Sequence, residues 1–181
     1  MSNQSFQSFV CSISLMLNNI YNILSDTEFI RLLIVLAGVG ATAIFTHIRQ
    51  QQQNRIQTSL NLYSEFHSES MLKSRIEADS IFEKNTSELP LDLIELRGKL
   101  EKDDWLHISK IIHFFEKYAV CHNLKYLDDA FAEATLRRYF IHWYKNYLYI
   151  IVKNHLDNSS DEWNAWAKSI KELADKENII I

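Results

Sequence analysis

Residues that interrupt helices are scarce in this chain. Its 181 residues include three glycines and a single proline, Pro90. Turns are therefore few, and the intervals between them are filled by leucine, isoleucine, alanine, glutamate and lysine, which favour helices. Because 47% of the residues are apolar and 12% are aromatic, the chain can bury one compact core. We predict an all-α protein.

Other features that the chain lacks bear on its function. The formal net charge is −4 and no block of lysine and arginine occurs, so nucleic acid is not an expected partner. No glycine-rich phosphate loop, nucleophile elbow or zinc-finger spacing is present, and we expect no cofactor. The two cysteines, Cys11 and Cys121, lie on opposite sides of the most apolar segment, which favours two free thiols over a disulfide.

That apolar segment, FIRLLIVLAGVGATAIFTHI, extends from Phe29 to Ile48. A helix rises about 1.5 Å per residue, so about 20 apolar residues match a hydrocarbon core about 30 Å thick. A buried core helix is the alternative, but residues 32–45 lack the polar face that such a helix normally keeps. A cleaved signal is disfavoured because Arg49 follows where a small-residue cleavage site is needed. We predict a transmembrane helix over residues 28–48.

The charges that flank this segment predict its orientation. Arg49 and Arg55 follow it, whereas Asp26 and Glu28 precede it. The positive-inside rule then places the amino terminus outside and residues 49–181 in the cytoplasm. Residues 1–27 carry apolar side chains at near-helical spacing, which predicts an amphipathic helix in the membrane interface. A second crossing helix is the alternative, although its asparagines would be costly in lipid.

Two stripes of side chains predict helix contacts. A patch of small residues inside the apolar segment would let a neighbouring helix approach closely, which suggests self-association; it contains Ala37, Gly38, Ala41 and Thr42. Beyond the segment the helix is expected to continue as a stalk with an apolar stripe, formed by Ile56, Leu60, Tyr63 and Phe66. We expect the later helices of the chain to cover this stripe, with a short parallel coiled coil between subunits as the alternative.

Residues 49–181 are expected to form one bundle of about five helices. Ser68 and Asp128 are candidate N-caps, and Asp103 or Asp104 opens a helix between them. The spacing of Ser159 and Glu162 is that of a capping box. Beyond the stalk, helices are expected over residues 69–85, 91–100, 105–123 and 129–156 and from residue 159 onward. The helix over 129–156 is predicted to be central, with a kink or break near Arg138.

Two segments of this domain, together with the anchor, resemble an uncharacterised family of bacterial helical proteins, a domain of unknown function. The segments are LYSEFHSESMLKSRIEA (residues 62–78) and IIHFFEKYAVCHNLKYLDDAFAEATLRRYFIHWY (residues 111–144). An arginine in the first and an aromatic–glutamate pair in the second recur in that family, and they correspond to Arg75, Phe115 and Glu116. The resemblance covers about residues 30–150. It implies a helical bundle tethered to the bacterial inner membrane and brings no established activity.

Glu116 is expected on or beside the buried face of its helix, next to Phe115. A buried carboxylate needs a cationic partner or several hydrogen bonds, because desolvation costs several kcal/mol. We expect Arg75 to be this partner, in an ion pair that sets the register of two helices. A ligand-binding or catalytic carboxylate is the alternative.

Histidines near Glu116 raise the question of a metal site. His113 and Glu116 are three residues apart and could face one ligand. Di-iron bundles, however, need a Glu-x-x-His pair on each of two helices together with further carboxylates. Here the order is reversed and the pair occurs once, so no metal is predicted.

The segment from Arg137 to Tyr149 is rich in arginine and aromatic residues, which are favoured at interfaces and also fill cores. Most of these residues are expected in the core, with Tyr144 and Tyr149 exposed. The candidate binding residues are therefore Arg75, Glu116, Arg138 and Tyr144.

These patterns predict a membrane-tethered helical binding or regulatory module without evident catalytic activity. Its expected partners are the lipid bilayer and a protein or a second copy of the chain. A membrane-active effector of the stress or phage-defence type, assembled through the transmembrane helix, is the alternative. An enzyme that uses Glu116 is the third hypothesis.

Overall fold

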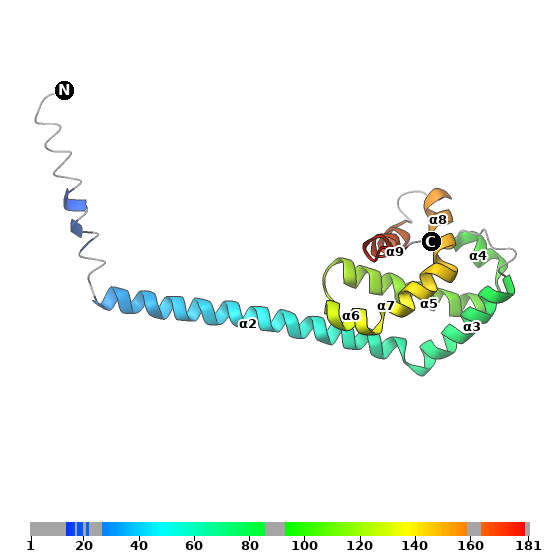
Figure 1. The fold of residues 1–181 in the computed structure, drawn as a ribbon, viewed down its shortest axis with the longest axis horizontal. Helices are drawn as coiled ribbons and strands as arrows, with labels where there is room; N and C mark the ends of the chain where they lie inside the picture. Colours follow the sequence, from blue (N-terminus) through cyan, green and yellow to red (C-terminus); the bar gives the residue numbers. More distant parts are fainter. Residues whose placement is uncertain are drawn as a thin grey trace, which may run out of the picture. The chain divides into compact units, whose positions relative to one another are not determined.

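A computed structural model of the chain describes residues 14–16, 18–19, 21, 27–85, 93–158 and 164–179. All regular elements in these residues are helical, so the predicted all-α class is confirmed (Figure 1). The described residues divide after Gln51 into two compact units. Most of the predicted amphipathic segment 1–27, the loop around Pro90 and the capping box at Ser159 and Glu162 lie outside the described residues.

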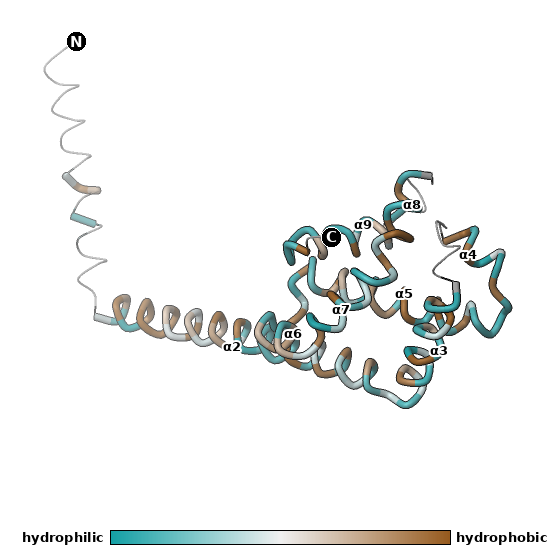
Figure 2. Tube along the Cα trace, turned by 45° about the vertical axis from the view of Figure 1, so that its right-hand side comes forward, coloured by the Kyte–Doolittle hydropathy of each residue, from teal (hydrophilic) through white to brown (hydrophobic). Residues whose placement is uncertain are grey.

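The longest element is α2, a single helix over Thr27–Phe66. The predicted continuation of the apolar helix into a polar stalk is therefore confirmed as helix. Its first turns are the most apolar part, brown and white in Figure 2. Threonine hydroxyls are satisfied inside the helix, since Thr42 Oγ1 donates to the Gly38 carbonyl at 2.8 Å and Thr46 Oγ1 to the Thr42 carbonyl at 2.8 Å. This bonding lets polar side chains occupy an apolar helix without unpaired hydroxyls.

Within the second unit, α2 is followed by α3, Glu69–Asn85, after a turn at His67 and Ser68. The backbone N–H of Met71 donates to the Ser68 hydroxyl at 3.3 Å, so the predicted cap at Ser68 is confirmed. The helices α4, Leu93–Lys99, and α5, Lys102–Asn123, come next. Asp103 and Asp104 lie in the first turn of α5, where carboxylates favour the positive end of the helix dipole.

The predicted long helix over residues 129–156 is divided in the structure. It consists of α6, Asp129–Thr135; α7, Arg137–Trp143; a π-helical turn η1, Tyr144–Leu148; and α8, Tyr149–Asn158. The division between α6 and α7 lies at Leu136, two residues before the predicted position. Asp128 caps α6, because its side chain accepts the Phe131 N–H at 2.9 Å. The last helix, α9, spans Ala165–Lys176.

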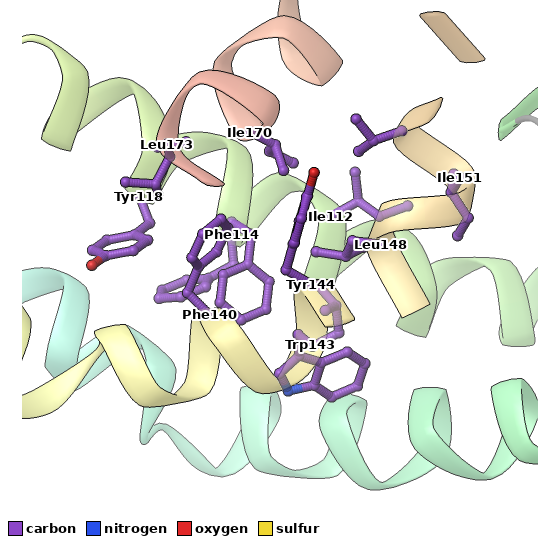
Figure 3. Packing of buried hydrophobic residues seen from close by; sticks show 14 of the residues in the cluster. Ile112, Phe114, Tyr118, Phe140, Trp143, Tyr144, Leu148, Ile151, Ile170 and Leu173 are labelled. Atoms are coloured by element: carbon purple, nitrogen blue, oxygen red, sulfur yellow. The ribbon is translucent and has the colours of Figure 1, made fainter. Parts of the chain in front are cut away.

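The core of the second unit forms around α5, which packs against α3 and α9. Aromatic rings fill its centre, and Phe115 lies 5.8 Å from Phe140 between ring centroids. Figure 3 shows this cluster, with Tyr118 contributed by α5, Phe140 by α7, and Ile170 and Leu173 by α9. The apolar face of α5 is therefore buried, as its helical spacing predicts.

The expected covering of the stalk stripe is wrong for Ile56 and Leu60, whereas the Tyr63 ring contacts Phe131 of a later helix at 5.9 Å between centroids. Phe66 is buried, but Ile56, Leu60 and Tyr63 remain 44%, 42% and 37% exposed. In this part of α2 the buried side chains are Ser59, Leu62 and Phe66. Ser59 is buried because its hydroxyl accepts the Asp128 N–H at 3.0 Å and donates to the Arg55 carbonyl at 3.0 Å. The buried face of this part of α2 therefore combines two apolar side chains with a serine whose hydroxyl is satisfied by a hydrogen bond across 69 residues.

Candidate functional site

Arg75, the first predicted binding residue, lies on α3 against aromatic rings. Its guanidinium carbon is 4.1 Å from the centre of the Phe66 ring and 5.8 Å from the centre of the Tyr139 ring. Its Nε is buried and has no hydrogen-bond partner in the described residues. Burial lowers the pKa of Arg75, and the nearby Tyr139 opposes this shift. Stacking on Phe66 thus takes the place of the expected carboxylate.

The predicted ion pair between Arg75 and Glu116 is wrong. Glu116 Oε2 instead lies 3.2 Å from Nδ1 of His113, on the same helix. Its side chain is 32% exposed, so the carboxylate keeps contact with water and does not require the buried cation that was expected. One residue earlier, Phe115 points into the core and is buried. The carboxylate therefore lies at the border of the buried face.

Arg138, on α7, is brought to the same ring as Arg75. Its guanidinium carbon lies 4.8 Å from the centre of the Tyr139 ring, and its Nη2 donates to the Tyr139 hydroxyl at 3.0 Å. Two of the four predicted residues thus contact one tyrosine. Both guanidinium groups lack an ion-pair partner among the residues that the structure describes, and neither lines one of the cavities described below.

Tyr144 lies elsewhere, in the wall of a cavity of about 320 Å³ beside η1, α8 and α9. We call this space the Tyr144 cavity. Its volume is at the lower end of the range of about 300–1,000 Å³ that is typical of small-molecule sites. The lining is formed mainly by aromatic rings and branched aliphatic side chains with three charged groups, and consists of Tyr144, Tyr149, Val152, Lys153, Leu156, Asp157 and Lys171.

The Tyr144 side chain is only 4% exposed, so the prediction that it is exposed is wrong. Its ring stacks on Phe140 at 5.6 Å between centroids. Figure 3 shows the ring edge-on, with the hydroxyl at the end farther from Trp143. This hydroxyl makes no hydrogen bond within the described part of the chain. Burial, with smaller effects of Asp175 and Tyr149, raises the pKa of Tyr144 to about 12, so the hydroxyl keeps its proton at neutral pH.

The wide turn of η1 places these groups. The N–H of Tyr149 donates to the carbonyl of Tyr144, five residues earlier, which is the bonding of a π-helix. Such a turn inserts one extra residue, and it commonly occurs at functional sites. Tyr144 and Leu148, at its two ends, both point into the core, while Tyr149 is half-buried and its ring centre is 6.1 Å from that of Tyr144.

Lysines form the polar part of the Tyr144 cavity. Lys171 of α9 makes an ion pair with Asp175 at 2.8 Å. Lys153 of α8 has no ion-pair partner among the described residues. Asp157 also lines the cavity, and Asp175 balances the charge of Lys171, so Lys153 is the lysine of the lining that is left without an ion pair in the described residues. The cavity thus combines an apolar wall, a tyrosine hydroxyl and one unpaired ammonium group.

A second, more polar cavity of about 180 Å³ lies beside α5, α6 and the end of α9. Glu177 is one of its lining residues. One carboxylate oxygen of Glu177 accepts a hydrogen bond from Arg137 Nε, and the other lies 3.7 Å from His122 Nε2. The bond to Glu177 raises the pKa of Arg137, and burial raises that of Tyr118. These contacts join the carboxyl end of α9 to α5 and α7, so we assign this cluster to stability.

The described residues contain no group of three or more histidine, cysteine, aspartate or glutamate side chains arranged to hold a metal ion. The fold and the Tyr144 cavity define an all-α bundle with a small-molecule-sized space and an apolar helix. Comparison with models of protein families, with curated proteins and with solved structures finds no match to this chain.

Sequence reasoning found Tyr144 but missed the rest of its cavity. Lys153 and Lys171 are 18 positions apart on different helices, and neither belongs to a recognisable motif. Only the packing of α8 against α9 brings them together. The predicted interruption near Arg138 corresponds to the division at Leu136, and no signal in the sequence indicated the π-helical turn η1.

Proposed function

We propose that this protein is a membrane-tethered helical binding module whose second unit works in the cytoplasm. One observation carries the tether. The single described helix that is long and apolar enough to cross a bilayer is α2, and none of its most apolar 18-residue window is buried. Val35, Val39 and Ile44 are each at least 60% exposed. A fully exposed apolar run of this length would be costly in water, and lipid would cover it.

The binding role is supported by the second unit. Its helices enclose a continuous aromatic and aliphatic core, so it can hold a cavity in a fixed shape. The Tyr144 cavity supplies a space of ligand size. Glu116 is half-buried, lies 3.2 Å from His113 and lines neither cavity. These observations favour binding over catalysis by Glu116.

The tether is tested by placing charge in the apolar run. Val35→Arg together with Val39→Arg is expected to move the full-length chain out of the membrane fraction that resists alkaline carbonate. An arginine at the centre of a spanning helix costs about 2.5–3.5 kcal/mol on insertion scales. The measurement is the carbonate-resistant fraction on an immunoblot of bacterial membranes.

A matched control uses the same helix beyond the run. Ile56→Arg together with Leu60→Arg also introduces two arginines, four residues apart, at exposed apolar positions of α2, and it should leave the carbonate-resistant fraction unchanged. If the unaltered chain is fully released by carbonate, the tether is wrong.

A further inference from the structure

We infer that the Tyr144 cavity binds a small amphipathic anion, with a carboxylate head and a short aliphatic body. This inference deepens the proposed function, because it names the ligand class of the binding module. It does not depend on the tether, since every group that carries it lies in the second unit.

The apolar lining of the Tyr144 cavity indicates that the body of the ligand is aliphatic. Val152 and Leu156 of α8 and the rings of Tyr144 and Tyr149 provide most of the lining. Val152 is 1% exposed and Tyr144 is 4% exposed, so these side chains are held by the core and cannot leave the cavity freely. Apolar surface of this kind favours a ligand that removes methylene groups from water.

The polar groups of the lining indicate that the head of the ligand is a hydrogen-bond acceptor. The ring of Tyr144 is buried, and its protonated hydroxyl has no acceptor in the described residues, so it is a donor for which a ligand in the cavity can supply an acceptor. Lys153 adds an ammonium group that makes no ion pair in the described part of the chain. Lys171 adds a second, already paired with Asp175 at 2.8 Å.

These donors select the charge of the ligand. A carboxylate can accept from the tyrosine hydroxyl and from Lys153 together, and charge-assisted hydrogen bonds are the stronger kind. A ligand cation would leave the hydroxyl proton without an acceptor and would lie beside the unpaired Lys153. Among the described residues of the lining, Asp157 is the one carboxylate, and Asp175 is already paired with Lys171.

Photoaffinity labelling of the full-length chain in lipid nanodiscs tests the inference. The probe is octanoate that carries a diazirine at its aliphatic end, and labelled peptides are mapped by mass spectrometry. We expect saturable labelling of peptides from η1, α8 and α9. Unlabelled octanoate should displace it, while octylamine at the same concentration should not. Hexanoate should compete about fifteenfold more weakly, since each lost methylene weakens binding about fourfold.

Substitutions separate the head from the body. Tyr144→Phe and Lys153→Gln each remove one polar contact and should weaken octanoate binding by about threefold to tenfold. Val152→Trp fills the cavity and should abolish saturable labelling. Ile150→Trp is its matched control, because Ile150 is on the same helix, is 47% exposed and does not line the cavity. Circular dichroism reports whether each variant folds. If Val152→Trp does not fold, Tyr144→Phe and Lys153→Gln still test the site.

Several results would overturn the inference. Labelling that is confined to α2, or that does not saturate, would show that the probe reads only the lipid. Equal displacement by octylamine would contradict the anionic head. Unchanged binding in both Tyr144→Phe and Lys153→Gln would remove these groups from the site. Because labelling of the second unit is scored apart from labelling of α2, failure here is distinct from failure of the tether.

Discussion

Two guanidinium groups lie near the Tyr139 ring. The guanidinium carbon of Arg75 is 5.8 Å from the ring centre, and that of Arg138 is 4.8 Å from it. At the scale of the residue, aromatic rings, and not carboxylates, contact the guanidinium groups of Arg75 and Arg138 in the described residues. A guanidinium is planar and weakly hydrated, so it can stack on a ring and remain partly buried. This explains why Arg75 does not need Glu116. Tyr144 follows a related rule, because its ring is packed in the core while its hydroxyl is available to a ligand.

The raised pKa of Tyr144, about 12, predicts a loss of stability in alkali. An unfolded tyrosine ionises near pH 10. The protonated form is favoured in the folded state, so its stabilising effect is complete below about pH 10 and is lost as the pH rises toward about 12. The free energy of unfolding is measured with urea at neutral pH and at about pH 11, in the unaltered chain and in Tyr144→Phe. It should fall between these pH values in both chains, and the fall should be smaller in Tyr144→Phe by on the order of 1 kcal/mol.

Tyr126→Phe is the control for this experiment, since Tyr126 is 57% exposed. Its alkaline loss of stability should equal that of the unaltered chain. Tyr118 and Tyr147, whose pKa values burial also raises, contribute to the loss that remains in Tyr144→Phe, together with the lysine ion pairs that weaken as lysine loses its proton. If Tyr144→Phe and the unaltered chain lose the same free energy, the hydroxyl does not resist ionisation.

At the scale of the element, a local cap and one long-range hydrogen bond both hold the start of α6. The Asp128 side chain accepts the Phe131 N–H at 2.9 Å, while its own backbone N–H donates to Ser59 at 3.0 Å. The start of α6 is thereby tied to the last turns of α2. This position of α6 sets the start of the aromatic segment that leads through α7 to η1.

The cap predicts a measurable stability difference between neighbouring aspartates. Asp128→Ala removes the acceptor for Phe131 and should lower the free energy of unfolding by about 1 kcal/mol. Asp129→Ala, one residue later in the first turn of α6, removes a charge that favours the helix dipole and should cost about 0.3 kcal/mol. Chemical unfolding followed by circular dichroism at 222 nm compares the two. Equal losses would mean that Asp128 acts only through its charge.

At the scale of the whole molecule, the proposed arrangement is an exposed apolar helix followed by a folded unit with a cavity. The two cysteines of the chain lie on either side of the apolar run. Cys121 is half-buried, and burial raises its pKa, so it reacts slowly even where a reagent can reach it. A more exposed position is therefore needed to report on the side of the membrane that is proposed to be cytoplasmic.

The orientation is predicted from the flanking charges. In a chain with Cys11→Ser, Cys121→Ser and Leu124→Cys, position 124 should react with a membrane-impermeant maleimide only after spheroplasts are opened; Leu124 is 56% exposed. With Cys121→Ser alone, Cys11 should react in intact spheroplasts. Gel-shift labelling measures both. The opposite pattern would reverse the orientation, and equal labelling of both sites before opening would contradict a spanning helix.

The sequence alone determined the helical class, the extent and continuity of α2, the caps at Ser68 and Asp128, and an interruption close to Leu136. These features depend on local properties: propensity, apolar spacing and short-range hydrogen bonds between neighbours in the chain. The membrane orientation and the binding role stay predictions.

The tertiary structure alone decided which polar groups meet. Arg75 stacks on Phe66 and does not pair with Glu116, α2 buries Ser59 in place of Ile56 and Leu60, and Tyr144 is buried at a cavity shared by α8 and α9. Each outcome depends on groups that lie far apart in the sequence. The energies that choose between such contacts differ by about 1 kcal/mol, which residue spacing along a single helix cannot resolve.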